Sequence, residues 1–171
     1  VLCNHIGPVN MICYDPVFDQ GKPGVDIVGS SFPLIFDPFA LVCFGALGKG
    51  LSISLDIKCC TMLFTTPSAA DIYLEDDTNN INALFVGGEA CIQGLEKKVT
   101  RIFRNAYGPT ECSIQATQGN TPDNIGGPLP NALCYIVHPD DATLCPPGVS
   151  GELWIGGVGV SLGYHKRPEL T

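Results

Sequence analysis

Residues 105–111 read NAYGPTE and place an amide, an aromatic ring, a Gly-Pro pair and a carboxylate side by side. An asparagine amide can hydrogen-bond the edge of a flat heterocycle, and a tyrosine ring can stack on its face. A glutamate can hold a metal ion that carries phosphate. The alternative is a plain turn at Gly108-Pro109 with incidental neighbours. The neighbouring sequence is needed to distinguish a nucleotide site from a turn.

A second glycine-containing stretch, VGGEA at 86–90, follows a predicted strand. Taken alone, its two glycines favour an ordinary turn between a strand and a helix, because short glycine patterns have low specificity. The next predicted strand leads directly into NAYGPTE. Since neighbouring parallel strands end at one edge of a sheet, the two turns are expected to form a glycine-lined ledge beside Tyr107 and Glu111. This arrangement favours a nucleotide site.

The elements around these motifs alternate between strand and helix. Apolar or alternating runs predict strands at 25–31, 51–55, 61–65, 82–86 and 100–108. Apolar spacing and breaker residues predict helices from about residue 6 to Pro16 and at 36–50, 67–76 and 91–99. This alternation predicts an α/β fold, with a mostly parallel sheet covered by helices.

The character of the chain changes after Glu111, where glycine and proline become frequent. Short strands are predicted at 132–137 and 151–157, separated by Pro146-Pro147-Gly148. We therefore expect an α/β part at 1–119, which carries the substrate and adenine edge, and a small β-rich part at 120–171.

Composition narrows the possible partners and the cellular location. The formal charge of −8 argues against nucleic acid or an anionic membrane as partner. No apolar run approaches the length of about 20 residues that a membrane span needs. The nine cysteines include no C-x-x-C pair, so we expect reduced, mostly buried thiols in a cytoplasmic protein and no zinc site.

The order of four stretches carries a family resemblance. GGEA, NAYGPTE, IGGPLPNALCYIV and PPGVSGELWIGGVGVSLGYHKRPELT resemble the adenylation domains of nonribosomal peptide synthetases. These domains belong to the adenylate-forming, or AMP-binding, superfamily together with acyl-CoA ligases and luciferases. The upstream stretches NHIGPVN and FDPFALVCFGALGKG fit the same order, so the resemblance covers nearly all of residues 1–171. It implies part of the large N-terminal subdomain of the adenylate-forming fold.

The resemblance implies an ATP-dependent ligase of secondary metabolism that works in two steps. ATP and an amino acid form an aminoacyl-adenylate, and the acyl group then passes to the phosphopantetheine thiol of a carrier domain, which neighbours a condensation domain. By similarity Asn105 and Tyr107 contact adenine, and the backbone at Gly87 and Gly88 lines the same slot. Thr110 and Glu111 are the implied catalytic residues, with Thr110 near the phosphate and Glu111 holding Mg²⁺.

Asp37 is the implied partner of the substrate's α-ammonium group, although a carboxylate near a helix start is often a cap. This match favours an α-amino acid substrate. The other implied pocket positions are Pro38, Leu41, Phe64, Phe85, Gly87, Ala106, Ile114 and Gln115. That wall carries no charge apart from Asp37 and predicts a neutral, apolar substrate side chain, with Gln115 as one hydrogen-bond partner. Cys91 and Cys112 are interpreted as packing residues, because this chemistry needs no protein nucleophile.

The chain also departs from the family pattern. The phosphate loop, the ribose-binding aspartate and the catalytic lysine of the small C-terminal domain have no counterpart here. We therefore expect a piece of something longer, a mis-spliced product or a decaying copy, with little or no activity alone. The link between strands 51–55 and 61–65 is about one helix short, which should expose apolar sheet surface. Two alternatives remain open, an acyl- or aryl-CoA ligase fragment and a non-catalytic nucleotide-binding or partner-binding remnant.

Overall fold

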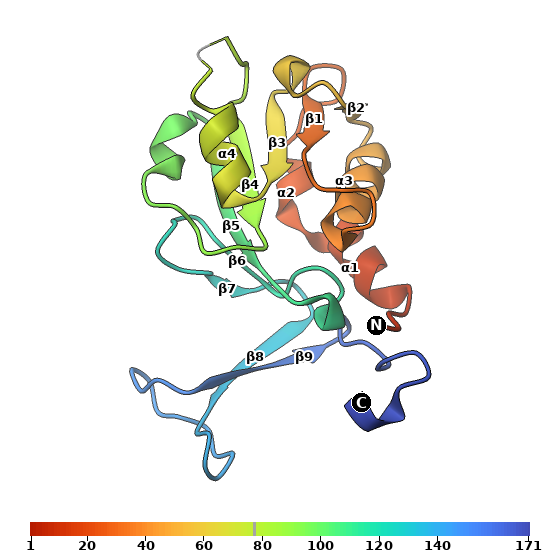
Figure 1. The fold of residues 1–171 in the computed structure, drawn as a ribbon, viewed down its shortest axis with the longest axis vertical. Coiled ribbons are helices and arrows are strands. Elements are labelled where there is room, and N and C mark those ends of the chain that lie inside the picture. The colour runs from red at the N-terminus through yellow and green to blue at the C-terminus, as the bar shows by residue number, and fades with distance from the viewer. Residues whose placement is uncertain (77) are drawn as a thin grey trace.

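A computed structural model describes residues 1–76 and 78–171 and contains a seven-stranded sheet above a two-stranded hairpin (Figure 1). The sheet has the order β2-β1-β3-β4-β5-β6-β7. Its parallel strands are β1 (Ile27–Ser30), β2 (Ser52–Ser54), β3 (Met62–Thr65), β4 (Ala83–Gly87) and β5 (Ile102–Tyr107). The antiparallel strands β6 (Thr117–Gly119) and β7 (Gly127–Pro128) complete the sheet. The predicted α/β class is confirmed, whereas β6 and β7 were not predicted.

Helices cover both faces of the sheet. One face packs against α1 (Ile6–Tyr14), α2 (Pro16–Asp19) and α3 (Asp37–Gly48), and the other packs against α4 (Pro67–Tyr73) and the 3-10 helix η2 (Leu95–Lys98). Successive strand residues point to opposite faces, so Phe64 and Phe85 lie in the first core and Leu63 and Leu84 in the second. Of the predicted helices, 91–99 forms only the short η2. None of the described helices has the length and apolar character needed to cross a membrane.

The hairpin pairs β8 (Ala132–Val137) with β9 (Glu152–Gly157) in antiparallel register. This confirms the β-rich region expected near the end of the chain. β7 still belongs to the seven-stranded sheet, so the change of architecture falls after Pro128. The domain boundary expected between residues 119 and 120 stays a prediction.

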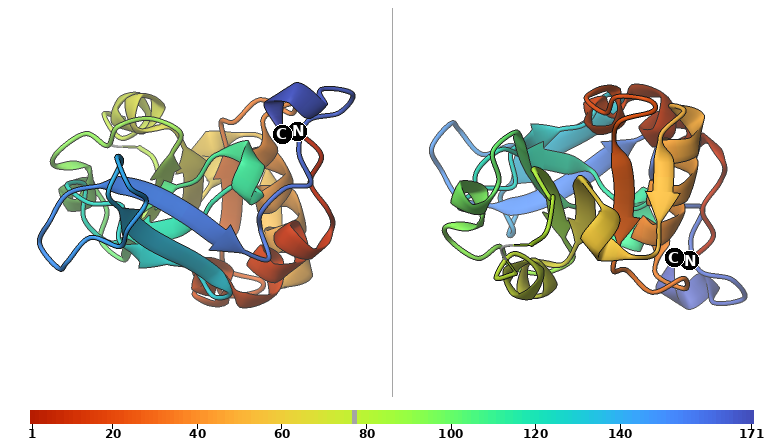
Figure 2. Two further views of the ribbon diagram at one scale, coloured as in Figure 1. Left: turned by 90° about the horizontal axis from the view of Figure 1, so that it is seen from below. Right: turned by 90° about the horizontal axis from the view of Figure 1, so that it is seen from above.

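The two ends of the chain lie side by side (Figure 2). The Leu2 amide donates to the Gly163 carbonyl at 2.7 Å, and the Leu162 amide donates to the Leu2 carbonyl at 2.8 Å. The last short helix, η4 (Pro168–Leu170), follows this pairing. These bonds hold the segment after β9 against the start of the chain.

The short link between β2 and β3 contains the 3-10 helix η1 (Ile57–Cys59). Cys60 is fully buried and packs so closely on Gly29 that a side chain there would collide with its sulfur. The link therefore covers β1 in place of a helix. Apolar surface remains beside it, because Leu55 is 83% exposed and Ile72 of α4 is 70% exposed. The expectation of exposed apolar sheet surface is not met, because these two side chains lie outside the strands and the apolar side chains of β1, β2 and β3 are buried or half-buried.

The cysteines are free, as expected, but the prediction that most are buried is wrong. Among the nine, only Cys60 is buried, while Cys3, Cys13 and Cys59 are exposed and the remaining five are half-buried. The apolar runs that carry them lie partly on uncovered surfaces. Cys134, for example, lies on β8, whose strand is only partly covered.

An ion pair between a buried carboxylate and an exposed arginine joins three strands at the end of the sheet where they begin. Asp26 precedes β1 and is 2% exposed. Its carboxylate accepts hydrogen bonds from Arg101 at 2.9 and 3.1 Å, from the Thr61 hydroxyl at 2.7 Å and from the Lys22 amide at 2.8 Å. Burial alone would raise the pKa of Asp26, but these donors outweigh it and lower the pKa. The starts of β1, β3 and β5 are thereby joined.

We predict that Asp26→Ala lowers the free energy of unfolding by about 2 kcal/mol, because it removes the buried acceptor of the hydrogen bonds from Arg101, Thr61 and Lys22. Urea denaturation of the chain measures this change. Asp19→Ala is the matched control, since Asp19 is 56% exposed and forms an exposed ion pair with Lys49, which contributes under about 1 kcal/mol. Equal losses in the two variants would contradict a special stabilising role for the Asp26–Arg101 pair.

Candidate active site

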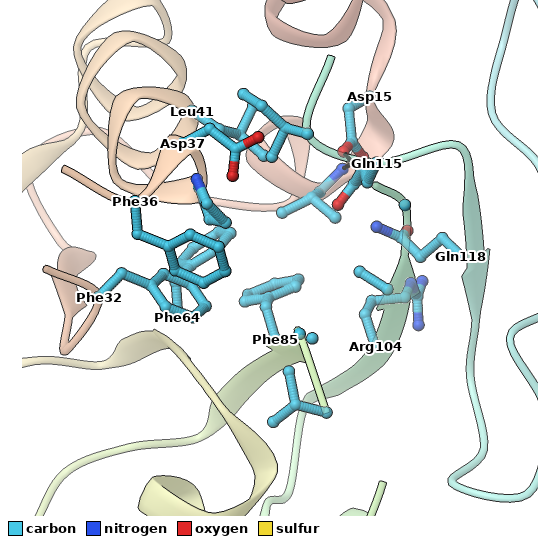
Figure 3. A pocket seen from close by; sticks show the side chains of 18 of the residues that line it. Asp15, Phe32, Phe36, Asp37, Leu41, Phe64, Phe85, Arg104, Gln115 and Gln118 are labelled. Atoms are coloured by element: carbon cyan, nitrogen blue, oxygen red, sulfur yellow. Dashed lines mark hydrogen bonds between the residues drawn. The ribbon is translucent and has the colours of Figure 1, made fainter. Parts of the chain in front are cut away.

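A cavity of about 260 Å³ opens at the carboxyl ends of β3, β4 and β5 (Figure 3). We call it the Asp37 cavity. All of the predicted substrate positions line it, namely Asp37, Pro38, Leu41, Phe64, Phe85, Gly87, Ala106, Ile114 and Gln115. Residues from α3, β3, β4, β5 and the segment before β6 therefore meet at one place. This is the edge of a parallel sheet at which ligands commonly bind.

Aromatic rings form one wall of the Asp37 cavity. Phe64 of β3 and Phe85 of β4 stack with ring centroids 4.4 Å apart and planes 16° apart. Phe18 of α2 stacks on the other face of Phe64 at 5.2 Å. Phe32 and Phe36 meet edge to face nearby. The wall is flat and apolar, and it suits a flat or apolar ligand group.

Asp37 supplies an unpaired carboxylate oxygen at this cavity. It is the first residue of α3, and Pro38 follows it in the first helical turn. Its Oδ2 is buried and has no hydrogen-bond partner among the described residues. Figure 3 shows the carboxylate facing the cavity. A buried oxygen in this state is costly to leave unpaired, so the site favours a ligand that brings a donor or a cation.

The opposite side of the Asp37 cavity is polar, which the sequence did not reveal. Asp15, Arg104, Gln115 and Gln118 lie there (Figure 3). The matched wall positions carry no charge apart from Asp37, but Asp15 and Arg104, which were not among them, also line the cavity. The Asp-Pro pair at residues 15 and 16 is a signal for a helix start, but it does not show which distant residue the aspartate meets.

Asp15 is 1% exposed and fully engaged. Its Oδ1 accepts the Val17 amide at 3.0 Å and so caps α2, and its Oδ2 accepts Gln115 Nε2 at 2.6 Å. Burial raises the pKa of Asp15 from 3.8 to about 6, against the opposing effects of the Val17 amide, Gln118, the Arg104 charge and Gln115. The carboxyl group is therefore ionised at neutral pH.

A second cavity, of about 390 Å³, adjoins the first, and we call it the Tyr107 cavity. Gly88, Ala106, Gly108 and Pro109 line both cavities. Asn105 and Tyr107 line the second one, and Tyr107 is 42% exposed. The structure thus brings the predicted adenine-contacting residues together in a recess that adjoins the Asp37 cavity.

Asn105 is buried and its nitrogen is already used. Nδ2 donates to the Asn124 carbonyl at 3.0 Å and to the Pro122 carbonyl at 3.4 Å. These bonds orient the amide, and Oδ1 is the atom left for another group. An amide oxygen accepts hydrogen bonds, so Asn105 can receive an amino group at the rim of the Tyr107 cavity.

Two glycines allow the backbone to take this shape. Gly88 has φ +84°, a conformation that L side chains rarely adopt. Gly108 has a different reason, since a Cβ there would collide with the backbone of Gln115. Gly108 is required because two chain segments touch at this point.

Thr110 and Glu111 lie in the 3-10 helix η3 (Thr110–Cys112), but they differ in their position relative to the two cavities. Thr110 lines the Asp37 cavity, whereas Glu111 lines neither of the two cavities. Glu111 Oε1 accepts the Tyr164 hydroxyl, and this hydrogen bond is the main cause of a lowered pKa of Glu111. Tyr164 was not predicted, because it follows Glu111 by 53 residues. The described residues hold no group of three side chains arranged for a metal.

The cysteines near the site have little nucleophilic character. Burial raises the pKa of the Cys91 thiol and of the Cys112 thiol. A raised pKa lowers the thiolate fraction at neutral pH. This agrees with their interpretation as packing residues.

The parallel sheet with two adjoining cavities at its strand ends makes this an α/β protein with a site where ligands commonly bind in such folds. Residues 18–165 match the AMP-binding enzyme family, and the chain belongs to that family of ATP-dependent adenylate-forming enzymes. Tyrocidine synthase 2 of Brevibacillus parabrevis is 32% identical over 206 residues, which include all of this chain. Adenylate-forming reductase 03009 of Coprinopsis cinerea is 34% identical over 183 residues, or 98% of the chain. The resemblance to peptide-synthetase adenylation domains is confirmed.

Solved structures agree with this assignment. The N-terminal subdomain of Klebsiella oxytoca NpsA, in complex with 3-hydroxyanthranilyl-AMSN, superposes on the whole chain with a TM-score of 0.81 and 25% identity. The chain covers 49% of that structure, 18% of the reductase and 6% of the tyrocidine synthase. The predicted fold, part of the N-terminal subdomain of adenylate-forming enzymes, is confirmed.

The raised pKa of Asp15 predicts a pH dependence of stability. The folded chain binds more protons than the unfolded chain between pH 3.8 and about 6, so its free energy of unfolding should fall as the pH rises through this range. The fall should reach about 3 kcal/mol and level off above the folded pKa. Urea unfolding of the wild type and of Asp15→Asn across this range measures the effect. A difference between the two proteins that does not change with pH would contradict it.

Proposed function

We propose that residues 1–171 form part of an adenylation domain that activates an α-amino acid with ATP. The product is an aminoacyl-adenylate, whose acyl group passes to the phosphopantetheine thiol of a carrier domain during nonribosomal peptide synthesis. The observation that carries the proposal is the buried, unpaired Oδ2 of Asp37 in a cavity that adjoins the Tyr107 cavity. The carrier and condensation partners and a cytoplasmic location are parts of this proposal.

Asp37 supports the choice of an amino acid over other carboxylic acids. An α-ammonium group brings a positive charge and three N–H donors to the unpaired oxygen, which a fatty or aryl acid does not. The apolar aromatic wall around it strengthens this pairing, because charges attract more strongly where water is excluded. An acyl- or aryl-CoA ligase is the alternative, and it leaves the Asp37 oxygen unexplained.

The Tyr107 cavity suits the adenine of ATP. The Tyr107 ring offers a face for stacking, and Asn105 Oδ1 offers an acceptor for the exocyclic amino group of adenine. The left-handed Gly88 lets the backbone approach the base closely. Because Gly88, Gly108 and Pro109 are shared by both cavities, a nucleotide bound in the Tyr107 cavity would lie next to the amino acid in the Asp37 cavity.

Thr110 and Glu111 are the residues proposed for the phosphate and the metal. Thr110 lines the Asp37 cavity, so its hydroxyl can donate to a phosphate or carboxylate oxygen at the junction. Glu111 follows Thr110 in η3 but lies outside both cavities, and from there it would hold Mg²⁺, which usually needs only one or two protein carboxylates besides phosphate oxygens and water. The metal would offset the repulsion between the carboxylate and the α-phosphate. The hydrogen bond from Tyr164 keeps Glu111 ionised and fixes its orientation.

The fate of the adenylate depends on parts of the protein beyond this subdomain. The relatives carry the names of a peptide synthase and of a reductase, so the family includes different second steps. Asp37 acts in the first step, so it does not indicate which second step follows. The chain spans less than half of these relatives, and we therefore propose the complete activity for the full-length protein that carries these residues.

The first test removes the proposed ammonium partner. In the full-length protein, Asp37→Ala should lower kcat/KM for amino-acid-dependent pyrophosphate exchange by roughly 100-fold or more, because a desolvated charge loses its counter-ion. The matched control is Asp71→Ala on α4, whose exposed ion pair with Lys98 lies outside both cavities. Unchanged exchange in Asp37→Ala would contradict amino-acid activation, and exchange with acids that lack an amine would favour the CoA-ligase alternative.

The second test addresses the nucleotide. Tyr107→Ala should raise the KM for ATP roughly 10-fold, because stacking of a base on an aromatic ring is worth about 1–3 kcal/mol. Tyr107→Phe keeps the ring and should retain most of the affinity. Calorimetry with ATP and Mg²⁺ checks binding independently of turnover. If both variants bind ATP as the wild type does, the Tyr107 cavity does not hold adenine, and a full-length protein that binds ATP without exchange would be a non-catalytic remnant.

A further inference from the structure

A contact between Asp15 and Gln115 lies at the polar side of the Asp37 cavity, and the proposed chemistry makes no use of it. The two residues are 100 positions apart in the chain, yet Gln115 Nε2 donates to Asp15 Oδ2 at 2.6 Å. Both residues line the cavity. The contact therefore decides how the Gln115 amide is presented to a ligand.

Asp15 cannot reorient to suit a ligand. Its other oxygen caps α2 through the Val17 amide, and its side chain is 1% exposed. An ionised carboxylate is an acceptor only, so the Gln115 amide must turn its nitrogen toward Asp15. Gln115 Oε1 is then the atom of the amide that makes no hydrogen bond within the described residues.

The charges around this point exclude a charged ligand group. Asp15 is negative, so it opposes an anionic side chain. Arg104 lines the same side of the cavity and opposes a cationic one. Asp15 also has both oxygens already occupied by Val17 and Gln115. A neutral group that donates a hydrogen bond to Gln115 Oε1 avoids repulsion from both charges and gives Oε1 a hydrogen-bond partner.

We propose that the substrate is an amino acid whose neutral side chain lies against the Phe85 ring and ends in an N–H or O–H donor. Gln115 Oε1 accepts from this donor, and Asp15 is the positioning residue that fixes the direction of the Gln115 amide. The inference rests on the proposed adenylation of an amino acid. Figure 3 shows the arrangement behind it, with the phenylalanines on one side and the polar residues on the other.

The substrate class is tested by pyrophosphate exchange in the full-length protein. A panel of standard amino acids identifies which side chains support exchange. Three phenylalanines of similar size then isolate the end group, namely 4-amino (a donor), 4-methyl (neither) and 4-cyano (an acceptor). The wild type should prefer the 4-amino over the 4-methyl compound by roughly 10-fold or more in kcat/KM. Exchange supported only by side chains without a donor would overturn the proposal.

The role of Asp15 is tested by Asp15→Asn. The amide oxygen of the substituted side chain should keep the cap on α2, because asparagine is a good capping residue, and the new NH₂ group would then face Gln115. The Gln115 amide should turn over and present its nitrogen to the cavity. The preference should therefore shift from the 4-amino to the 4-cyano compound. A loss of activity without this shift would indicate a structural role and overturn the positioning role.

Two further variants complete the design. Gln115→Met removes the acceptor at similar size and should abolish the preference between the 4-amino and 4-methyl compounds, even if Asp15→Asn does not fold. Asp19→Asn makes the same chemical change on the exposed end of α2 and should keep the wild-type preference. A preference that survives in Gln115→Met would overturn the inference alone. Absence of exchange with every amino acid would overturn the proposed function and, with it, this inference.

Discussion

The site depends on the close approach of Gly108 to the backbone of Gln115. The chain leaves β5 at Tyr107, passes through η3 and returns as β6, which pairs antiparallel with β5. A Cβ at Gly108 would collide with the backbone of Gln115 just before β6, so only glycine allows the two segments to touch. The Ala116 amide closes the loop by donating to the Tyr107 carbonyl at 2.9 Å. One side of this loop faces the Tyr107 cavity and the other carries Ile114 and Gln115 into the Asp37 cavity.

The return of the loop is strained, and packing holds it in place. Ser113 has φ +57° and Ile114 has φ +84°, although a β-branched residue disfavours positive φ. Such conformations persist where the surroundings over-determine them. The Ser113 hydroxyl donates to the Gly159 carbonyl at 2.7 Å, and the Ser161 amide donates to the Glu111 carbonyl at 2.7 Å. The segment after β9 therefore braces the loop from below, which gives the glycine-rich end of the chain a structural part in the site.

The sequence predicted those features that depend on local patterns. Apolar runs located β3, β4 and β5, and the family motifs located Asp37 and the 105–111 segment at one edge of the sheet. Short elements without a periodic pattern were missed, as with α2, β6 and β7. Contacts between distant positions were missed for a different reason. Tyr164 reaches Glu111, and Asp15 reaches Gln115, only because the fold brings them together, and no spacing in a single sequence encodes such a meeting.

The two aspartates of the Asp37 cavity show why residue type alone does not assign a role. Asp15 is an acceptor whose oxygens are both filled by protein donors, so it orients its neighbours and offers nothing to a ligand. Asp37 has a buried oxygen with no hydrogen-bond partner among the described residues, so a ligand that supplies a donor lowers the free energy of the complex. In the proposed function, Asp37 therefore binds the substrate through an unmet hydrogen-bonding requirement, whereas Asp15 selects among substrates because its own requirement is already met. On this proposal, one cavity with two similar carboxylates has one end that binds the ammonium group and another that discriminates between side chains.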